Sequence, residues 1–398
     1  MTSKATNPAP GRDTAGPAGE VRRLRPAVKL PVRIARQMED RVVAEGWPVG
    51  HRIGSEAGLA VDMGVCRHTL REAVRILEVS GLVESRKGKN GGLFVAADAC
   101  NFACKTFSNY LEFVQVDVDE LSAIHRALTH FVIDQAMAVL SQAQIVTLRR
   151  QISDLSTLSA PEQIPAAEDL HHALLDGVGN PALTLFVRVL DKMMLDASIF
   201  STLSDEQWLE MPHRLVNLLV DKLAAILDGD RDRAFAISEA YVQGCAAMFK
   251  ASSFADRQPL DEGATQRAYN FLPRAKPFKK AERVEQAIRD LIIAQGWPVG
   301  RNLGSEAELG ARFGVGRSVL REALRSLEQL GVIEMGRGGR SGLRIISPDP
   351  AAVIETCRRH LRRERLDAGQ SLRLRAVIEA TGSPAPAQIG QLLLSILA

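Results

Sequence analysis

Two short segments carry arginine residues at a spacing of four, which is close to one turn of an α-helix. They are RHTLREAVRIL at residues 67–77 and RSVLREALRSL at residues 317–327. A helix that enters the major groove of DNA presents its N-terminal side chains to the bases, and arginine can pair bidentately with guanine. The candidates for such contacts are Arg67, His68, Thr69 and Arg71 in the first segment, and Arg317, Ser318, Val319 and Arg321 in the second.

Arg75 and Arg325 lie one turn further along these predicted helices. Each could contact a phosphate group of DNA, or it could form an ion pair within the chain. The possible partners within the chain are Glu72 and Glu78 in the first segment, and Glu322 and Glu328 in the second. The spacing leaves both roles open.

Both segments belong to a longer stretch that the chain contains twice. Residues 46–95 align with residues 296–345 without a gap, at an offset of 250, and 25 of the 50 aligned positions are identical. Differences such as Val74/Leu324 keep the apolar character, so both copies are expected to fold. The copies differ at the candidate base contacts His68/Ser318 and Thr69/Val319, which predicts different half-site preferences.

Each copy shows the pattern of three helices followed by a β-hairpin. In the first copy a helical period ends at Gly46, Ser55 is a good N-cap for a short helix, and Gly64 precedes the helix that begins near Arg67. Two short strands then flank a glycine-rich loop, as in a winged helix-turn-helix. The loop cations expected to neutralise phosphates or to enter the minor groove are Lys87, Lys89, Arg337 and Arg340.

The charges are distributed unevenly along the 398 residues, although the net charge is only +3. Residues 1–96 carry 16 Lys and Arg against 10 Asp and Glu, and residues 267–366 carry 20 against 11. Residues 110–250 carry 10 against 20. Basic flanks around an acidic centre are typical of a chain whose flanks meet a polyanion, although solvated surface charge would look similar.

Patterns for other kinds of chemistry are missing from the sequence. No GxxxxGK[ST] motif and no strand followed by GxGxxG is present, and no Ser/His/Asp, Cys/His or paired-carboxylate arrangement is recognisable. The five cysteines show no CxxC spacing, which predicts unpaired thiols in a reducing cytoplasm. The sequence therefore predicts no enzymatic activity. It also lacks an apolar run of 18 residues and a secretory signal, so no membrane span is expected.

The middle of the chain, from Asp117 to Lys250, lacks alternating strand patterns and predicts amphipathic helices. Turn chemistry predicts breaks at residues 159–165, at Gly179-Asn180-Pro181 and at Asp228-Gly229-Asp230. The predicted fold is mostly α, with two winged helix-turn-helix domains on either side of an all-α bundle. The predicted layout is a disordered tail at 1–30, a first winged domain at 31–96, the bundle at 110–250, a linker at 251–280, a second winged domain at 281–347, and the truncated start of a second bundle at 348–398.

These segments resemble the GntR family of bacterial transcription regulators, in the FadR-like subgroup that carries an all-helical FCD domain. The two arginine-containing helices and the preceding SEAGLA and SEAELG segments are similar to the family's DNA-binding domain. Asp169-Leu170-His171, Gly179-Asn180-Pro181 and Gly229-Asp230 are similar to the FCD domain. The resemblance implies a double-stranded DNA operator as partner, and action as a repressor in the bacterial cytoplasm, with the nucleoid.

FCD domains often hold a divalent metal ion with one aspartate and three histidines, and the resemblance places these ligand positions at Ala167, His171, Leu219 and Tyr241. Only His171 is a metal-ligand type, so we expect no metal and no other cofactor, unless Glu168 or Asp169 takes part in a shifted register. Arg126 and His171 are candidates for contact with a small organic-acid effector, although Arg126 could equally be a surface residue.

The resemblance also implies dimerisation, because operators of such regulators have two half-sites. Two winged domains in one chain could instead form an intramolecular pseudo-dimer. A further possibility is a degenerate fused paralogue that binds DNA or dimerises without sensing an effector. The incomplete metal ligand set and the short C-terminal segment motivate this alternative.

Overall fold

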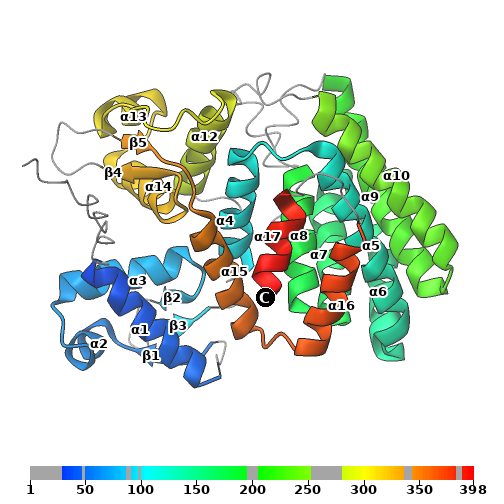
Figure 1. The fold of residues 1–398 in the computed structure, drawn as a ribbon, viewed down its shortest axis with the longest axis horizontal. Helices are drawn as coiled ribbons and strands as arrows, with labels where there is room; N and C mark the ends of the chain where they lie inside the picture. Colours follow the sequence, from blue (N-terminus) through cyan, green and yellow to red (C-terminus); the bar gives the residue numbers. More distant parts are fainter. Residues whose placement is uncertain are drawn as a thin grey trace, which may run out of the picture.

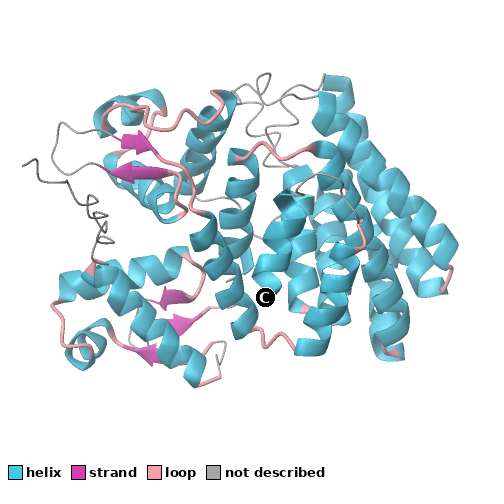
Figure 2. Ribbon diagram, in the orientation of Figure 1, coloured by secondary structure: helices cyan, strands magenta, loops and turns pink. Residues whose placement is uncertain are grey.

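The structure is a computed structural model that describes residues 29–46, 50–86, 91–96, 100–194, 205–251, 280–335, 343–381 and 388–398. Two small domains lie on one side of the molecule and a helical bundle on the other (Figure 1). Helices dominate, and the strands within the described ranges lie in the two small domains (Figure 2). The predicted class, mostly helical with two winged helix-turn-helix domains, is confirmed. The tail predicted at 1–30 and the linker predicted at 251–280 lie almost wholly outside the described residues.

The first winged domain is built as the sequence signals indicate. Ser55 caps its second helix by accepting a hydrogen bond from the backbone N–H of Gly58 (3.1 Å), and Gly64 takes a φ of 62° in the turn before the third helix. One strand was not predicted from the sequence: Arg52–Gly54 forms a short strand that pairs with the second wing strand. The elements are α1 (Leu30–Ala44), β1 (Arg52–Gly54), α2 (Glu56–Asp62), α3 (Arg67–Val79), β2 (Val83–Arg86) and β3 (Gly92–Val95), and the antiparallel sheet has the order β1-β3-β2.

The second winged domain repeats this arrangement on its own core. Ser305 forms a capping box with Glu308, and Leu320, Leu324 and Leu327 are fully buried. Its first strand is reduced to an isolated bridge between Asn302 and Arg344. The elements are α12 (Lys280–Ala294), α13 (Glu306–Arg312), α14 (Arg317–Gln329), β4 (Ile333–Met335) and β5 (Leu343–Ile345).

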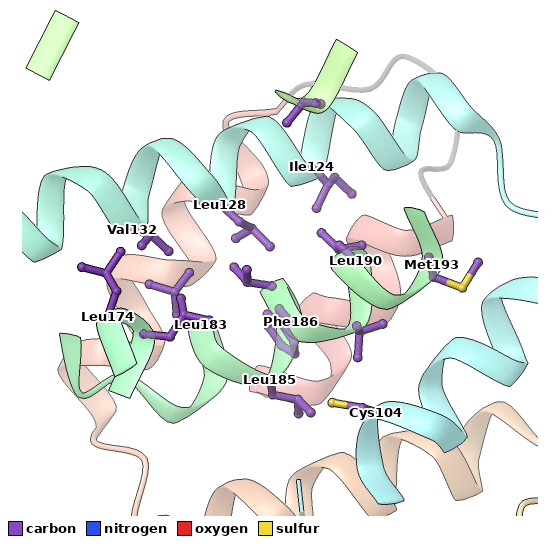
Figure 3. Close-up of a cluster of buried hydrophobic side chains, with 14 of the residues drawn as sticks. Cys104, Ile124, Leu128, Val132, Leu174, Leu183, Leu185, Phe186, Leu190 and Met193 are labelled. Atoms are coloured by element: carbon purple, nitrogen blue, oxygen red, sulfur yellow. The ribbon is translucent and has the colours of Figure 1, made fainter. Parts of the chain in front are cut away.

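The bundle surrounds a continuous apolar core. Phe186 and Leu190 of the central helix α8 lie against Ile124 and Leu128 of α5 (Figure 3). Phe186 also meets the ring of Phe107 edge to face, with 6.4 Å between the ring centroids. The bundle helices are α4 (Cys100–Phe113), α5 (Val118–Val139), α6 (Gln142–Leu155), α7 (Ala160–Val178), α8 (Pro181–Met194), α9 (Asp205–Asp228) and α10 (Arg231–Ala251). Among the described residues, no helix is long and apolar enough to cross a membrane.

The break predicted at residues 159–165 lies earlier in the structure, at residues 156–159, and residues 160–165 are helical. Helix α7 begins at Ala160, where Ser159 forms a capping box with Glu162. The prolines suggested a loop, yet Pro161 lies in the first turn, where a missing backbone N–H costs nothing. Helix α4 was also not predicted as a separate element.

Three C-terminal helices share the core of the bundle. They are α15 (Pro350–Arg363), α16 (Ala368–Glu379) and α17 (Gln388–Leu397), and they contribute the buried residues Val353, Cys357, Leu361, Leu374, Ile378, Ile389, Leu392, Leu393 and Ile396. The backbone N–H of Ile389 donates to the carboxylate of Glu120 on α5 (2.7 Å). This segment therefore packs onto the existing bundle and buries most of its large apolar residues, although Leu372 of α16 stays exposed.

The correspondence at an offset of 250 continues beyond the winged domains into these helices. Asp117 caps α5 and Asp367 caps α16, each with its carboxylate. Just before them, Gln115 and Arg365 both have a positive φ, of 50° and 55°. Helices α15 and α16 are thus the second-copy counterparts of α4 and the start of α5.

The turn glycine of the second winged domain offers a test of its backbone geometry. Gly314 has a φ of 59°, and a methyl group there would meet no other atom, so Gly314→Ala isolates the cost of a left-handed alanine. We expect a loss of about 1–2 kcal/mol in the free energy of unfolding. The control is Gly310→Ala inside α13, where the first copy has Ala60, and it should be neutral or stabilising. Equal urea denaturation midpoints for both variants would contradict this geometry.

Candidate nucleic-acid interface

The predicted base-contacting residues occupy the same exposed face in both copies. Arg67 and His68 are exposed at the start of α3, as are Arg317 and Ser318 at the start of α14. The next position is half-buried in both helices, at Thr69 and Val319, and the one after it is buried in the domain core. Each helix therefore presents its N-terminal turn to solvent while its opposite face holds it to the domain.

A glutamate at the start of the preceding helix holds one arginine of each set. The Arg71 guanidinium lies 2.9 Å from the Glu56 carboxylate, and Arg321 lies 2.9 Å from Glu306. Glu306 also lies 3.5 Å from the Arg317 guanidinium. These ion pairs are exposed and stabilise the fold little, but they orient the guanidinium groups. Neither glutamate was predicted from the sequence, although Glu56 and Glu306 each stand 15 residues before the paired arginine.

The ion pairs considered for Arg75 and Arg325 do not form among the described residues. Arg75 is exposed, Arg325 is half-buried, and Glu328 lies 3.9 Å from Lys29 of the first winged domain instead. A phosphate contact by these two arginines stays a prediction.

The wing cations Lys87, Lys89, Arg337 and Arg340 lie outside the described residues. At the base of the first wing, the Arg86 guanidinium stacks over the Phe94 ring, 4.3 Å from its centroid, and Arg52 donates to the Gly91 carbonyl (2.9 Å). These contacts support the start of the wing.

Cys66 stands directly before α3, which with α14 carries the candidate base contacts; we call α3 and α14 the recognition helices. Cys66 is exposed, and its Sγ lies 3.2 Å from the Thr69 hydroxyl. That hydrogen bond lowers the pKa of the Cys66 thiol. The equivalent residue in the second copy is Gly316, and the other four cysteines are buried or half-buried.

The interior of the bundle holds a second cluster of polar residues. Asp191 of α8 bridges His125 of α5 and His171 of α7, at 3.0 and 3.1 Å from their Nε2 atoms. Burial opposes the negative charge of Asp191, but the hydrogen bonds from both histidines hold its pKa well below the usual range. Lys222 of α9 is only 4% exposed, and burial lowers its pKa. Its ammonium lies 5.5 Å from the centroid of the Tyr241 ring.

This cluster does not fit a divalent metal ion. Of the four positions implied by the family resemblance, Ala167 and Leu219 offer no donor atom, and the Lys222 ammonium already supplies a positive charge beside Asp191. Among the described residues, no group of three His, Cys, Asp or Glu side chains could hold a metal ion.

The two candidate effector residues lie in different surroundings. His171 belongs to this buried cluster, whereas the Arg126 guanidinium, 39% exposed, pairs with Glu239 of α10. Asp191, His125 and Lys222 were not predicted from the sequence, because they come from three separate helices and no local spacing connects them.

Comparisons with known proteins identify the two small domains. Residues 30–95 and 280–343 each match the family described as "Bacterial regulatory proteins, gntR family". An uncharacterized HTH-type transcriptional regulator of Mycobacterium tuberculosis is 38% identical over 85 residues, which are 20% of this chain and 34% of that protein. The HTH-type transcriptional repressor NanR of Edwardsiella tarda is 37% identical over 76 residues, which are 19% of this chain and 28% of NanR. The chain thus spans about a third of the length of these relatives.

Solved structures also align with the chain. Streptococcus agalactiae GntR covers 55% of this chain and 99% of its own, at 18% identity and a TM-score of 0.36. Escherichia coli McbR/YncC covers 57% of this chain and 100% of its own, at 15% identity and a TM-score of 0.29. The sequence matches show that the chain contains two gntR-type helix-turn-helix domains.

The buried His171 and the half-buried His172 make the stability of the fold depend on pH. Burial lowers the pKa of His171 and lowers that of His172 to about 3, whereas an unfolded histidine titrates at about 6.5. Between these values the unfolded chain binds protons that the folded chain does not, so the free energy of unfolding falls as the pH falls below about 6.5. We expect His172→Gln to reduce this loss by about 1–2 kcal/mol between pH 7 and pH 4.5. Urea denaturation of the parent and of the exposed control His51→Gln should show the full dependence, and a parallel curve for His172→Gln would contradict the prediction.

Alkylation of Cys66 would block the N-terminal turn of α3 without modifying the equivalent position before α14. A maleimide that reacts with the exposed thiol would place its bulk beside Arg67 and Thr69, while the second copy has no thiol there. We expect DNA to protect Cys66 from alkylation, and alkylation to weaken DNA binding roughly tenfold or more. Cys66→Ser should bind DNA normally and resist the reagent. Unchanged DNA affinity after complete alkylation would show that this face does not meet DNA.

Proposed function

We propose that this protein is a transcription regulator that binds DNA with two winged helix-turn-helix domains of one chain. The observation that carries the proposal is the equal presentation of Arg67 and Arg71 on α3 and of Arg317 and Arg321 on α14. These side chains are exposed over intact apolar cores, in two domains that match the gntR family. The basic charge of both flanks favours a polyanionic partner.

The position of the two domains supports joint binding to one operator. Both lie on the same side of the molecule, and they touch through α3 and α14 and through Lys29 and Glu328 (Figure 1). Covalent linkage raises the local concentration of the second domain once the first is bound. One chain could therefore occupy two half-sites as an intramolecular pseudo-dimer. A homodimer would present four domains instead.

The bundle is proposed chiefly as the scaffold that holds the two domains. A response to a small organic acid is the finer proposal, and the buried polar cluster around His171 supports it. An entering carboxylate would compete with Asp191 for the Lys222 ammonium. Repression of transcription in the bacterial cytoplasm, with the nucleoid, is proposed by analogy with relatives that are named repressors.

A second candidate is a fused paralogue that binds DNA without sensing an effector. The missing metal donors at Ala167 and Leu219 favour it. The two candidates share DNA binding and differ in whether a small acid changes it.

Mutation of the first arginine of each recognition helix tests the proposal. Genomic fragments captured by the parent protein would supply the binding site, and affinities of Arg67→Ala, Arg317→Ala and the double variant would be measured over a salt series. Because a bidentate arginine–guanine pair contributes about 1–3 kcal/mol, each single variant should lose roughly tenfold or more in affinity. Arg150→Ala, which removes an exposed arginine of the bundle, is the matched control.

The double variant Arg67→Ala with Arg317→Ala tests whether both winged domains together account for specific DNA binding. It should bind specific and unrelated fragments with similar, weak affinity. Binding of the captured site by the double variant as tightly as by the parent would contradict the proposed function.

A further inference from the structure

The helix after each wing packs on the winged domain of the other copy. Helix α4, which follows the first wing, contacts α12 of the second winged domain through Lys105, whose Nζ lies 2.9 Å from the Glu285 carboxylate. Helix α15, which follows the second wing, contacts α1 of the first winged domain through Arg359, whose Nη1 lies 3.1 Å from Glu39. The connection between the two copies is therefore crossed.

The two crossed contacts correspond to each other at the offset of 250. Glu39 corresponds to Arg289, and Arg359 corresponds to Asn109. Arg289 donates from Nη1 to the Asn109 side-chain oxygen at 3.2 Å, which is the second-copy version of the pair between Glu39 and Arg359. The same pair of positions thus meets twice, but with different residues each time.

The charges at these positions differ between the two copies, so they affect which copies can pack on each other. Suppose that the second copies of two chains packed on each other in this manner. Arg289 of one chain would then face Arg359 of the other. Glu285 would face Glu355, which is the residue that corresponds to Lys105. Both contacts would bring like charges together at a site where Arg289 and Glu285 are almost fully buried. Buried like charges are strongly unfavourable.

Pairing of two first copies would lose the favourable contacts. Glu39, 5% exposed, would face Asn109 without a cation, and Lys105 would face Ala35, which corresponds to Glu285. Pairing of two first copies would replace the Arg359 guanidinium beside Glu39 by an uncharged amide. In the mixed arrangement Glu39 and Glu285 each lie beside a cation, and Arg289 donates to the Asn109 amide. In that arrangement the Glu285 carboxylate also accepts a hydrogen bond from the Ser326 hydroxyl (2.6 Å).

Aromatic packing also favours contact between a first copy and a second copy. Phe113 of α4 meets Trp297 of the second winged domain edge to face, with 5.7 Å between the ring centroids, and Phe102 packs on the same core. The corresponding residues of α15 are Arg363 and Ala352. If two second copies packed on each other, Arg363 and Ala352 would therefore lie against this core in place of the two aromatic rings.

We propose that the two copies carry a pairing code that matches the first copy to the second and disfavours the pairing of two second copies. Its key residues are Glu39 and Arg359 on one side, and Lys105, Glu285, Arg289 and Asn109 on the other. The selected partner is the other copy within the same chain. The code does not depend on whether the winged domains bind DNA, so failure of the DNA-binding proposal would leave it intact.

Transplanting second-copy residues into the first copy tests the code in the full chain. Glu39→Arg recreates the arginine–arginine contact expected between two second copies, and Lys105→Glu recreates the glutamate–glutamate contact. Each should lower the apparent Tm by roughly 4 °C or more. The control Arg41→Glu changes an exposed charge on the same helix, and it should shift the apparent Tm by no more than about 1 °C.

The double variant Glu39→Arg with Arg359→Glu separates pairing from general damage. The reversed pair restores opposite charges, so its apparent Tm should return to within about 2 °C of the parent, even if Glu39→Arg alone does not fold. Additive losses in the double variant, or a Glu39→Arg protein as stable as the Arg41→Glu control, would overturn the proposal.

Discussion

The crossed packing of α4 on the second winged domain and of α15 on the first is the contact on which the arrangement of the molecule depends. Each winged domain is joined covalently to one of these helices and rests on the other, through Lys105 and Glu285 in one case and Arg359 and Glu39 in the other. Neither domain can therefore swing away without separating buried or partly buried charges. The recognition helices α3 and α14 are held in one orientation relative to each other as a result.

This contact also explains how a short duplicated segment can be stable. Helices α15 to α17 are too few to enclose a core of their own, but their apolar residues, such as Leu361 and Leu393, join the core around Phe186. The carboxylate of Glu120 caps the start of α17 and ties it to α5. The C-terminal helices of the second copy thus complete their packing on the bundle within the same chain.

Local signals made the winged domains predictable. The apolar stripe of each third helix, the Ser55 cap and the Gly64 turn act over a few residues, and the repeat confirmed each signal a second time. The exposed arginines followed from that register. The break before α7 was predicted too far along the chain. Pro161 suggested a loop, although a proline is compatible with the first turn of a helix.

Contacts between residues that are distant in the sequence could not be predicted from the sequence. Glu39 and Arg359 stand 320 positions apart, and neither is unusual in its own segment. Asp191 joins His125 and His171 only because α8 lies between α5 and α7, and the acidic partners of Arg71 and Arg321 come from the preceding helices. Such pairs depend on how helices pack, which composition and periodicity do not specify.

We propose that one chain places two winged domains on one operator, and the mass of the complex tests this most directly. Sedimentation equilibrium of the 43.3 kDa protein on a captured duplex with two half-sites should give one chain per duplex, with weaker binding when either half-site is changed. Saturation at two chains per duplex, with one winged domain of each chain dispensable, would contradict it.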